Sequence, residues 1–213
     1  MVKNSPFLAL GATLCLLLSS CETKSHNPLS SPDTARLDQR LVGDWYGSDG
    51  QDTFHFTATH GPWIHVEVIP RKTDEGKRTV LFTSRPETYD LFPTVIGRYT
   101  YLNVKVTGDD DEDQSGPSYV FVRYTVSGDR VLQMWMISQD AAADAVRAGW
   151  IKGVIHQDKD PLMVGKPPRP DVDVTLQDTS ANLVALIQNS NVKRLFSEKM
   201  ETLYRVKPAG QKD

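Results

Sequence analysis

Two short runs of alternating residues, joined by a glycine-containing loop, constrain the fold of this chain most strongly. Residues 53–58 and 63–69 place large apolar side chains at every second position, with polar side chains between them. Successive side chains of a β-strand point to opposite faces, so each run is typical of a strand with one buried and one solvated face. Residues 59–61 fit a three-residue hairpin loop with glycine in the left-handed position. The segment predicts an antiparallel hairpin that pairs Phe56 with Ile64.

Further strand-like runs follow, with turn residues between them, at residues 41–46, 77–84, 91–96, 99–106, 119–126, 131–137, 150–156, 172–176 and 202–206. Pro93 interrupts one of them and predicts an irregular edge strand there. Residues 140–147 and 180–189 have helical patterns, and a short helix after Pro32 is also expected. About eight to ten short strands with two or three short helices predict a mainly β domain with small α content, an antiparallel barrel or sandwich.

The run at 41–46 contains Gly43-Asp44-Trp45, which resembles the Gly-x-Trp signature of lipocalins and lipocalin-like proteins. The resemblance implies a closed antiparallel barrel around an apolar cavity. It also implies that Trp45 plugs one end of that barrel, and that an arginine from the last strand stacks on its ring. Arg205 stands in the expected place. Such a cation–π contact is worth about 0.5–2 kcal/mol. We therefore expect Gly43, Trp45 and Arg205 to form one cluster.

The first 21 residues carry an export pattern: Lys3, an apolar run over 7–18, and then small residues. The run is shorter than the roughly 20 residues that a membrane-spanning helix needs. Residues 18–21, Leu-Ser-Ser-Cys, resemble the lipobox of bacterial lipoproteins. The resemblance implies cleavage after residue 20 and attachment of acyl chains such as palmitate to Cys21. An ordinary cleaved signal followed by a free thiol is the alternative.

This pattern leads to expectations about how the chain is organised and where the protein is located. Residues 1–20 form the signal peptide, residues 21–33 form a flexible polar tether, and residues 34–213 form a single domain. The only other cysteine, Cys15, lies inside the signal, so the mature chain has no internal disulfide. Glu22 after the lipidated residue implies, by the enterobacterial sorting rule, transport to the outer membrane. The domain would then face the periplasm of a bacterial cell envelope.

Composition excludes some functions. The formal net charge is −3 and the basic residues are scattered. Nucleic-acid binding requires a clustered basic face, so no nucleic-acid partner is expected. The sequence lacks the common hydrolase, phosphate-loop and dinucleotide motifs, and we predict neither enzymatic activity nor a cofactor.

Two groups of polar residues are candidates for a metal site. His55, His60 and His65 recur every five residues, and the predicted register places His55 opposite His65 with Glu67 on the same face. Two imidazoles and a carboxylate suit zinc, but this is the solvated face, so we predict no metal there. The acidic run at 109–113 does not meet the spacing of a calcium-binding loop and is interpreted as a solvated loop.

The aromatic residues of the predicted strands are candidates for a pocket. We expect Phe54, Phe56, Ile64, Tyr124 and Trp135 to line the barrel interior. Ordinary core packing explains the same residues. The predicted function is binding of a small apolar molecule inside the barrel of a membrane-anchored lipoprotein. The alternative is a cell-envelope protein-interaction module, such as an inhibitor, immunity or assembly factor, without a small ligand.

Overall fold

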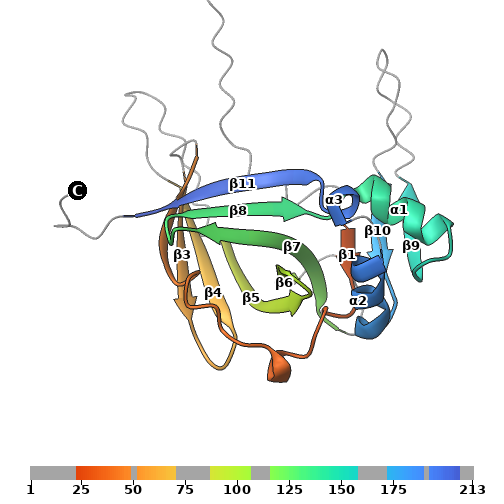
Figure 1. Ribbon diagram of the computed structural model, residues 1–213, viewed down its shortest axis with the longest axis horizontal. Coiled ribbons are helices and arrows are strands. Elements are labelled where there is room, and N and C mark those ends of the chain that lie inside the picture. The colour runs from red at the N-terminus through yellow and green to blue at the C-terminus, as the bar shows by residue number, and fades with distance from the viewer. Residues whose placement is uncertain are drawn as a thin grey trace, which may run out of the picture.

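A computed structural model describes residues 23–48, 52–70, 87–106, 116–157, 172–189 and 192–206 (Figure 1). Within these ranges the strands are β1 (Thr23–Ser25), β2 (Gly43–Gly47), β3 (Asp52–Ala58), β4 (Ile64–Pro70), β5 (Glu87–Ile96), β6 (Tyr99–Val106), β7 (Ser118–Ser127), β8 (Val131–Met136), β9 (Gly153–Gln157), β10 (Val172–Leu176) and β11 (Glu198–Arg205). The helices are α1 (Gln139–Arg147), α2 (Ser180–Asn189) and α3 (Val192–Leu195), and Pro32–Thr34 forms a 3-10 turn.

Eight strands form a closed antiparallel barrel. Their order is β2, β3, β4, β5, β6, β7, β8 and β11, and β11 pairs with β2 to close the ring. The structure confirms the mainly β class and the antiparallel barrel predicted from the strand pattern. Closure leaves the ring without a free edge. A three-strand extension, β1, β10 and β9, continues from β7, which curves out of the barrel toward the helices (Figure 1).

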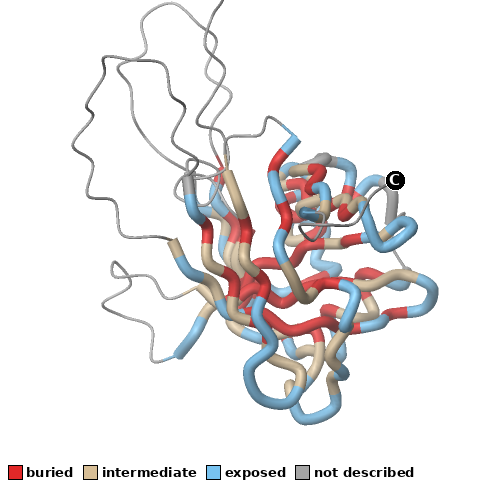
Figure 2. Tube along the Cα trace, turned by 90° about the vertical axis from the view of Figure 1, so that its left-hand side faces the viewer, coloured by how far each residue is buried: buried red, intermediate tan, exposed pale blue. Residues whose placement is uncertain are grey.

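Apolar side chains form two clusters, one on each side of the barrel wall. One fills the barrel interior and includes Trp45, Phe54 and Leu132. The other lies between the outer face of the wall and the α1–α3 side, and includes Tyr101 and Phe196. Figure 2 shows buried residues running along the middle of the strands rather than their ends. The middle of β6, residues 101–104, is therefore buried on both faces.

The β3–β4 hairpin exists, but its predicted register is wrong by two residues. Phe56 pairs with Val66, and Ala58 pairs with Ile64, so the loop has five residues. Gly61 has the expected left-handed φ of 57°. The N–H of Thr59 donates to the carbonyl of Trp63 at 3.0 Å, which closes the wider loop. A shift of two residues keeps every side chain on its face, so the predicted buried face is still correct.

The irregular edge strand predicted around Pro93 is also wrong. β5 is a barrel strand that pairs with β4 up to Leu91 and with β6 along Asp90–Ile96. Pro93 lies just past the last residue that pairs with β4. Its missing N–H therefore removes no hydrogen bond to that neighbour. The strand predicted at residues 77–84 lies outside the described residues.

The segment predicted as a flexible tether is structured from its third residue onward. Thr23–Ser25 form β1, which pairs in parallel with β10 and, through Ser25, with β7. Leu29 is buried, and its N–H donates to the Oδ1 of Asn103 at 2.7 Å. The tether prediction is wrong here because a polar composition does not reveal pairing with a strand about 150 residues away. The folded domain therefore includes the segment from Thr23 onward.

The predictions of α1 and α2 are confirmed, whereas the helix expected after Pro32 is only the 3-10 turn Pro32–Thr34. α1 follows Ser138 and ends before Gly149, whose φ is 71°, and α2 covers residues 180–189 as predicted. Leu183, Leu186 and Ile187 of α2 are buried. No helix among the described residues is long and apolar enough to cross a membrane.

Candidate functional site: a one-ended barrel cavity

Trp45 closes one end of the barrel. Its side chain is 0% exposed, and its indole Nε1–H donates to the carbonyl of Leu41 at 2.7 Å. The guanidinium carbon of Arg205 lies 4.3 Å from the centre of the indole ring. Arg205 is the cross-strand partner of Trp45 on β11. The stacking predicted for these two residues is therefore present.

Arg205 also binds three backbone carbonyls, which come from two segments of the chain. It donates through Nη1 to Val42 at 2.8 Å, through Nε to Asp129 at 2.7 Å, and through Nη2 to Arg40. The planar guanidinium can satisfy several diverging acceptors at once, which the ammonium of lysine cannot do in this geometry. Arg205 thus fastens the chain that enters β2 to the β7–β8 turn.

Gly43 completes the cluster because no side chain fits at its position. A Cβ there would lie 2.7 Å from Nη1 of Arg205, and the φ of Gly43 is 128°. Both the close approach and the backbone conformation favour glycine. The three residues of the sequence signature therefore form one physical unit.

A second group of polar contacts, around Asp38, lies near Arg40 in the segment that leads into β2. The buried hydroxyl of Tyr124 donates to Oδ2 of Asp38 at 2.9 Å, and Arg40 binds the same carboxylate at 2.8 Å. Burial raises the pKa of Tyr124 well above its usual range, and the neighbouring Asp38 raises it further. Burial alone would raise the pKa of Asp38, but the hydrogen bonds from Arg40 and Tyr124 lower it overall. Both groups thus keep their ordinary charge at neutral pH.

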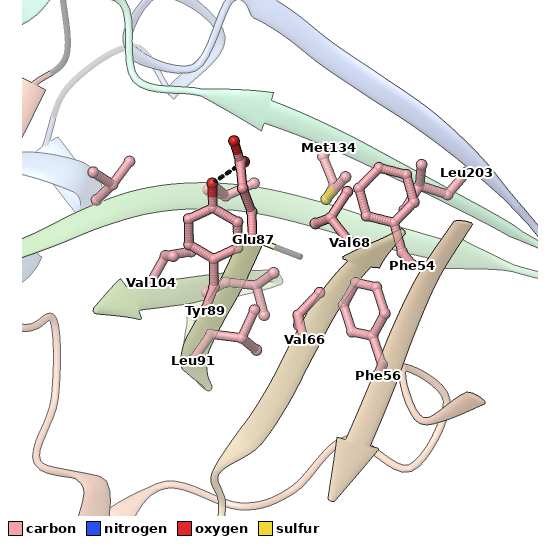
Figure 3. Close-up of a pocket in the computed structure, with 13 residues that line it drawn as sticks. Phe54, Phe56, Val66, Val68, Glu87, Tyr89, Leu91, Val104, Met134 and Leu203 are labelled. Carbon is pink, nitrogen blue, oxygen red and sulfur yellow. Dashed lines mark hydrogen bonds between the residues drawn. The ribbon is translucent and has the colours of Figure 1, made fainter. Parts of the chain in front are cut away.

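The barrel encloses an apolar cavity of about 70 Å³ (Figure 3). It is lined by Phe54, Phe56, Val66, Val68, Glu87, Tyr89, Leu91, Leu102, Val104, Val120, Val122, Met134 and Leu203. Eleven of these side chains are buried, whereas Glu87 and Tyr89 are partly exposed and mark the opening. The Tyr89 hydroxyl donates to Oε2 of Glu87 at 2.8 Å. The cavity therefore has apolar walls, and a hydrogen-bonded polar pair, Glu87 and Tyr89, lies at its opening.

The five predicted pocket residues divide into three groups. Phe54 and Phe56 line the cavity. Ile64 and Tyr124 belong to the same interior cluster but do not line the cavity. The prediction that Trp135 lines the barrel interior is wrong. Its side chain packs against the outer cluster, and the guanidinium of Arg123 lies 4.7 Å from its ring. The alternation along β8 turns Met134 inward, and its neighbour must then face outward.

Sequence reasoning missed the valines and leucines that make up most of the lining. They sit at alternating positions on β4 (Val66, Val68), β6 (Leu102, Val104) and β7 (Val120, Val122). The alternation was the available signal, but β7 has apolar residues on both faces, so its sequence did not show which face points inward. Glu87 and Tyr89 carried no pattern that could have placed them at the mouth.

The polar residues weighed as metal ligands do not gather. His55 faces Glu67 across the hairpin rather than His65, and its Nδ1 contacts Oδ1 of Asp44 at 2.6 Å. His65 instead contacts Asp90 at 2.9 Å. Among the described residues no group of three or more histidine, cysteine or acidic side chains could hold a metal ion. The acidic run at 109–113 and Cys21 lie outside the described residues.

These features define a closed eight-stranded antiparallel β-barrel that has one plugged end and an apolar cavity opening at partly polar residues. Comparisons with protein-family models, with curated proteins and with solved structures found no match to this chain.

Proposed function

We propose that this protein is a lipid-anchored bacterial envelope protein whose lipocalin-like barrel binds the slender end of an apolar molecule. The observation that carries the proposal is the cavity itself. Burying hydrocarbon against eleven apolar side chains gains roughly 25 cal/mol for each Å² removed from water. A polar ligand would gain nothing there, because its hydrogen bonds to water would be lost without replacement.

The size of the cavity narrows the class of ligand. Its volume is about 70 Å³. An engineered apolar cavity of about 150 Å³ binds benzene, and sites for drug-sized ligands start near 300 Å³. A bulky ring system does not fit within the barrel. The terminal methylene groups of an alkyl or acyl chain do, with the rest of the molecule extending through the mouth.

The mouth supports an amphiphilic ligand. Glu87 and Tyr89 are the partly exposed residues of the lining, and their hydrogen bond at 2.8 Å places polar atoms where the chain would leave the barrel. A ligand with an apolar tail and a neutral polar head would match this arrangement. An anionic head would meet the Glu87 carboxylate, so we expect neutral amphiphiles to bind better than fatty-acid anions.

A size-matched pair of variants tests ligand binding in the barrel. Val68 lines the cavity, whereas Val95 of β5 is 72% exposed and does not line it. We expect Val68→Phe, or the milder Val68→Leu, to reduce bound ligand at least about tenfold by filling the cavity, and Val95→Phe to leave it unchanged. Native mass spectrometry of protein isolated from its own envelope measures the bound species. Equal ligand occupancy in the Val68 and Val95 variants, both still folded by circular dichroism, would refute the proposal.

The structure limits how far the domain could lie from the proposed lipid anchor. Acyl chains on Cys21 would hold the protein to the bilayer, and two or more chains are needed for lasting attachment. Thr23 already belongs to β1 and is buried. Two residues span at most about 7 Å, so the domain would lie directly against the lipid surface rather than on a long tether. The proposed location is the periplasmic face of the outer membrane.

Replacing the proposed lipidation residue tests the anchor. We expect Cys21→Ala to remove the acyl mass and to move the protein from the membrane fraction to the soluble fraction, because no other anchor is proposed. Intact-mass measurement and membrane fractionation provide the readouts. Insertion of about ten Gly/Ser residues after Glu22 serves as the companion variant, and it should stay on the membrane but become cleavable by added protease. An unlipidated wild-type chain that still sediments with membranes would rule the anchor out.

The alternative, an envelope protein-interaction module, also has an observation in its favour. Tyr204, Tyr46, Thr53 and Ile69 are successive cross-strand partners on β11, β2, β3 and β4. Tyr46, Tyr204 and Ile69 are exposed, and the two tyrosine rings stack at 5.5 Å. Aromatic side chains are enriched at protein interfaces, so this stripe is where a partner protein would bind.

A further inference from the structure

A second and larger concavity lies outside the barrel, on the helical side of the molecule. Its volume is about 670 Å³, and it is open to solvent on one side. α1, α2 and α3 all contribute to it, through Ala141, Asp144, Ala145, Ala148, Trp150, Asn182, Ala185, Leu186, Arg194 and Leu195. We call it the helical groove. Its volume falls within the roughly 300–1,000 Å³ of small-molecule sites.

Short side chains create the hollow. α1 presents Ala141, Ala145 and Ala148 on one stripe, and α2 presents Ala185 with Leu186. Residues three and four apart lie on the same face of a helix, so α1 offers a row of alanines beside Asp144, and α2 places Ala185 and Leu186 on the same face as Asn182. Larger residues at these positions would fill the space between the helices, whereas alanine leaves a smooth apolar floor.

Trp150 forms an exposed aromatic wall beside this floor. The end of α1 has the hydrogen bonds of a Schellman motif: Gly149 N–H donates to Val146 and Trp150 N–H to Ala145, both at 3.0 Å. The residue at the position of Trp150 usually packs on the last turn of the helix. Here that turn offers only the methyl group of Ala145, and the indole remains 69% exposed. The backbone therefore holds a large aromatic surface in place without covering it.

A cluster of one aspartate and two arginines lies at the rim, and Asp144 and Arg194 of this cluster line the groove. Asp144 pairs with Arg147 at 3.1 Å and with Arg194 at 3.3 Å, so one carboxylate is shared by two guanidinium groups. Arg194 is 71% exposed and lines the groove. A guanidinium has five N–H donors, and the single contact with Asp144 leaves others for an anion. Charge complementarity at this rim thus favours a ligand with a negative group.

We propose that the helical groove binds a small amphiphilic anion, with a flat apolar body on the alanine floor beside Trp150 and its anionic group at Arg194. This site is separate from the barrel cavity. It would bind an anionic head group, whereas the barrel is proposed to prefer a neutral one. The proposal does not depend on the barrel ligand or on the lipid anchor. A helical peptide partner is the competing occupant, and the charge dependence of binding by a small molecule separates the two.

Isothermal titration calorimetry of the full chain tests the site, with naphthalenesulfonate as the anionic probe and naphthalenemethanol as its neutral analogue. We expect the anion to bind at least about tenfold more tightly than the neutral compound, and the difference to shrink at high salt. Arg194→Gln should abolish this preference. Trp150→Ala should weaken both compounds about tenfold by removing the aromatic wall.

A matched pair of variants locates the site. Ala185 lines the groove, whereas Ala181 is exposed on the same helix and does not. Ala185→Leu should block the probe about tenfold, and Ala181→Leu should bind as wild type. Val68→Phe in the barrel should also leave probe binding unchanged, which separates this site from the proposed function. Unchanged binding in Ala185→Leu, or equal affinity for the charged and neutral probes, would overturn the proposal.

Discussion

Replacing Trp45 by alanine should lower the free energy of unfolding by about 3–5 kcal/mol. The indole is 0% exposed, so the substitution removes one of the largest buried side chains of the interior cluster and leaves a cavity. It also leaves the carbonyl of Leu41 without its donor, and it removes the ring on which Arg205 stacks. These losses act together, because Arg205 binds the chain that enters β2 and the β7–β8 turn beside the same ring. Urea unfolding followed by circular dichroism measures the effect.

Trp150→Ala is the control for that experiment. It removes the same side chain from a site where 69% of the surface is exposed, so we expect a loss below about 1 kcal/mol. A Trp45→Ala variant that loses no more than the Trp150 variant would show that Trp45 does not plug the barrel. The interpretation of Gly43, Trp45 and Arg205 as a lipocalin-like signature would then lose its physical basis.

Replacing Asn103 by leucine should lower the free energy of unfolding by about 3 kcal/mol, despite a similar side-chain size. The Asn103 side chain is fully buried in β6 and accepts the N–H of Leu29 at 2.7 Å. Its amide donates to the hydroxyl of Thr94 at 2.8 Å and to the carbonyl of Phe92 at 3.2 Å. Leucine satisfies none of these groups, and each buried donor or acceptor left unpaired costs about 1–3 kcal/mol.

This variant also probes how the N-terminal segment is attached. Hydrogen exchange of the Leu29 amide should accelerate in Asn103→Leu, because its acceptor is gone. Asn27→Ala provides the comparison: Asn27 is exposed and its side chain donates one hydrogen bond, to the backbone carbonyl of Asp178, so we expect a loss of about 1 kcal/mol or less. Equal stability of the two variants would mean that the buried asparagine does not hold the segment to the barrel.

Local patterns predicted the elements of this fold well. The alternation of β3 and β4 identified the buried face correctly even though the loop length was wrong, because a two-residue slip preserves the side-chain direction. Gly43, Trp45 and Arg205 were placed together from three positions in the sequence, and the structure brings them together. In each case the information is local, or is carried by a strand pairing that barrel closure requires.

The candidate site was harder to predict because it depends on how strands with two apolar faces are oriented. β7 has buried residues on both faces, and its sequence does not show which of them look into the barrel. Trp135 was assigned to the wrong side because Met134, Trp135 and Met136 of β8 are all apolar, so the sequence did not show which of them face inward. The free volume inside the barrel is the small difference between the space enclosed and the side chains that fill it, so no single residue determines it.

The sequence by itself determined the β class, the number and order of most elements, the plugged end of the barrel, and a resemblance to lipid-anchored envelope proteins. These follow from periodicity, turn residues and short motifs, which act over a few residues. Only the tertiary structure decided that Thr23–Ser25 belong to the sheet, that the interior is nearly filled, and that an open groove lies between the helices. Those features depend on contacts between segments far apart in the chain, whose free energies no local pattern records.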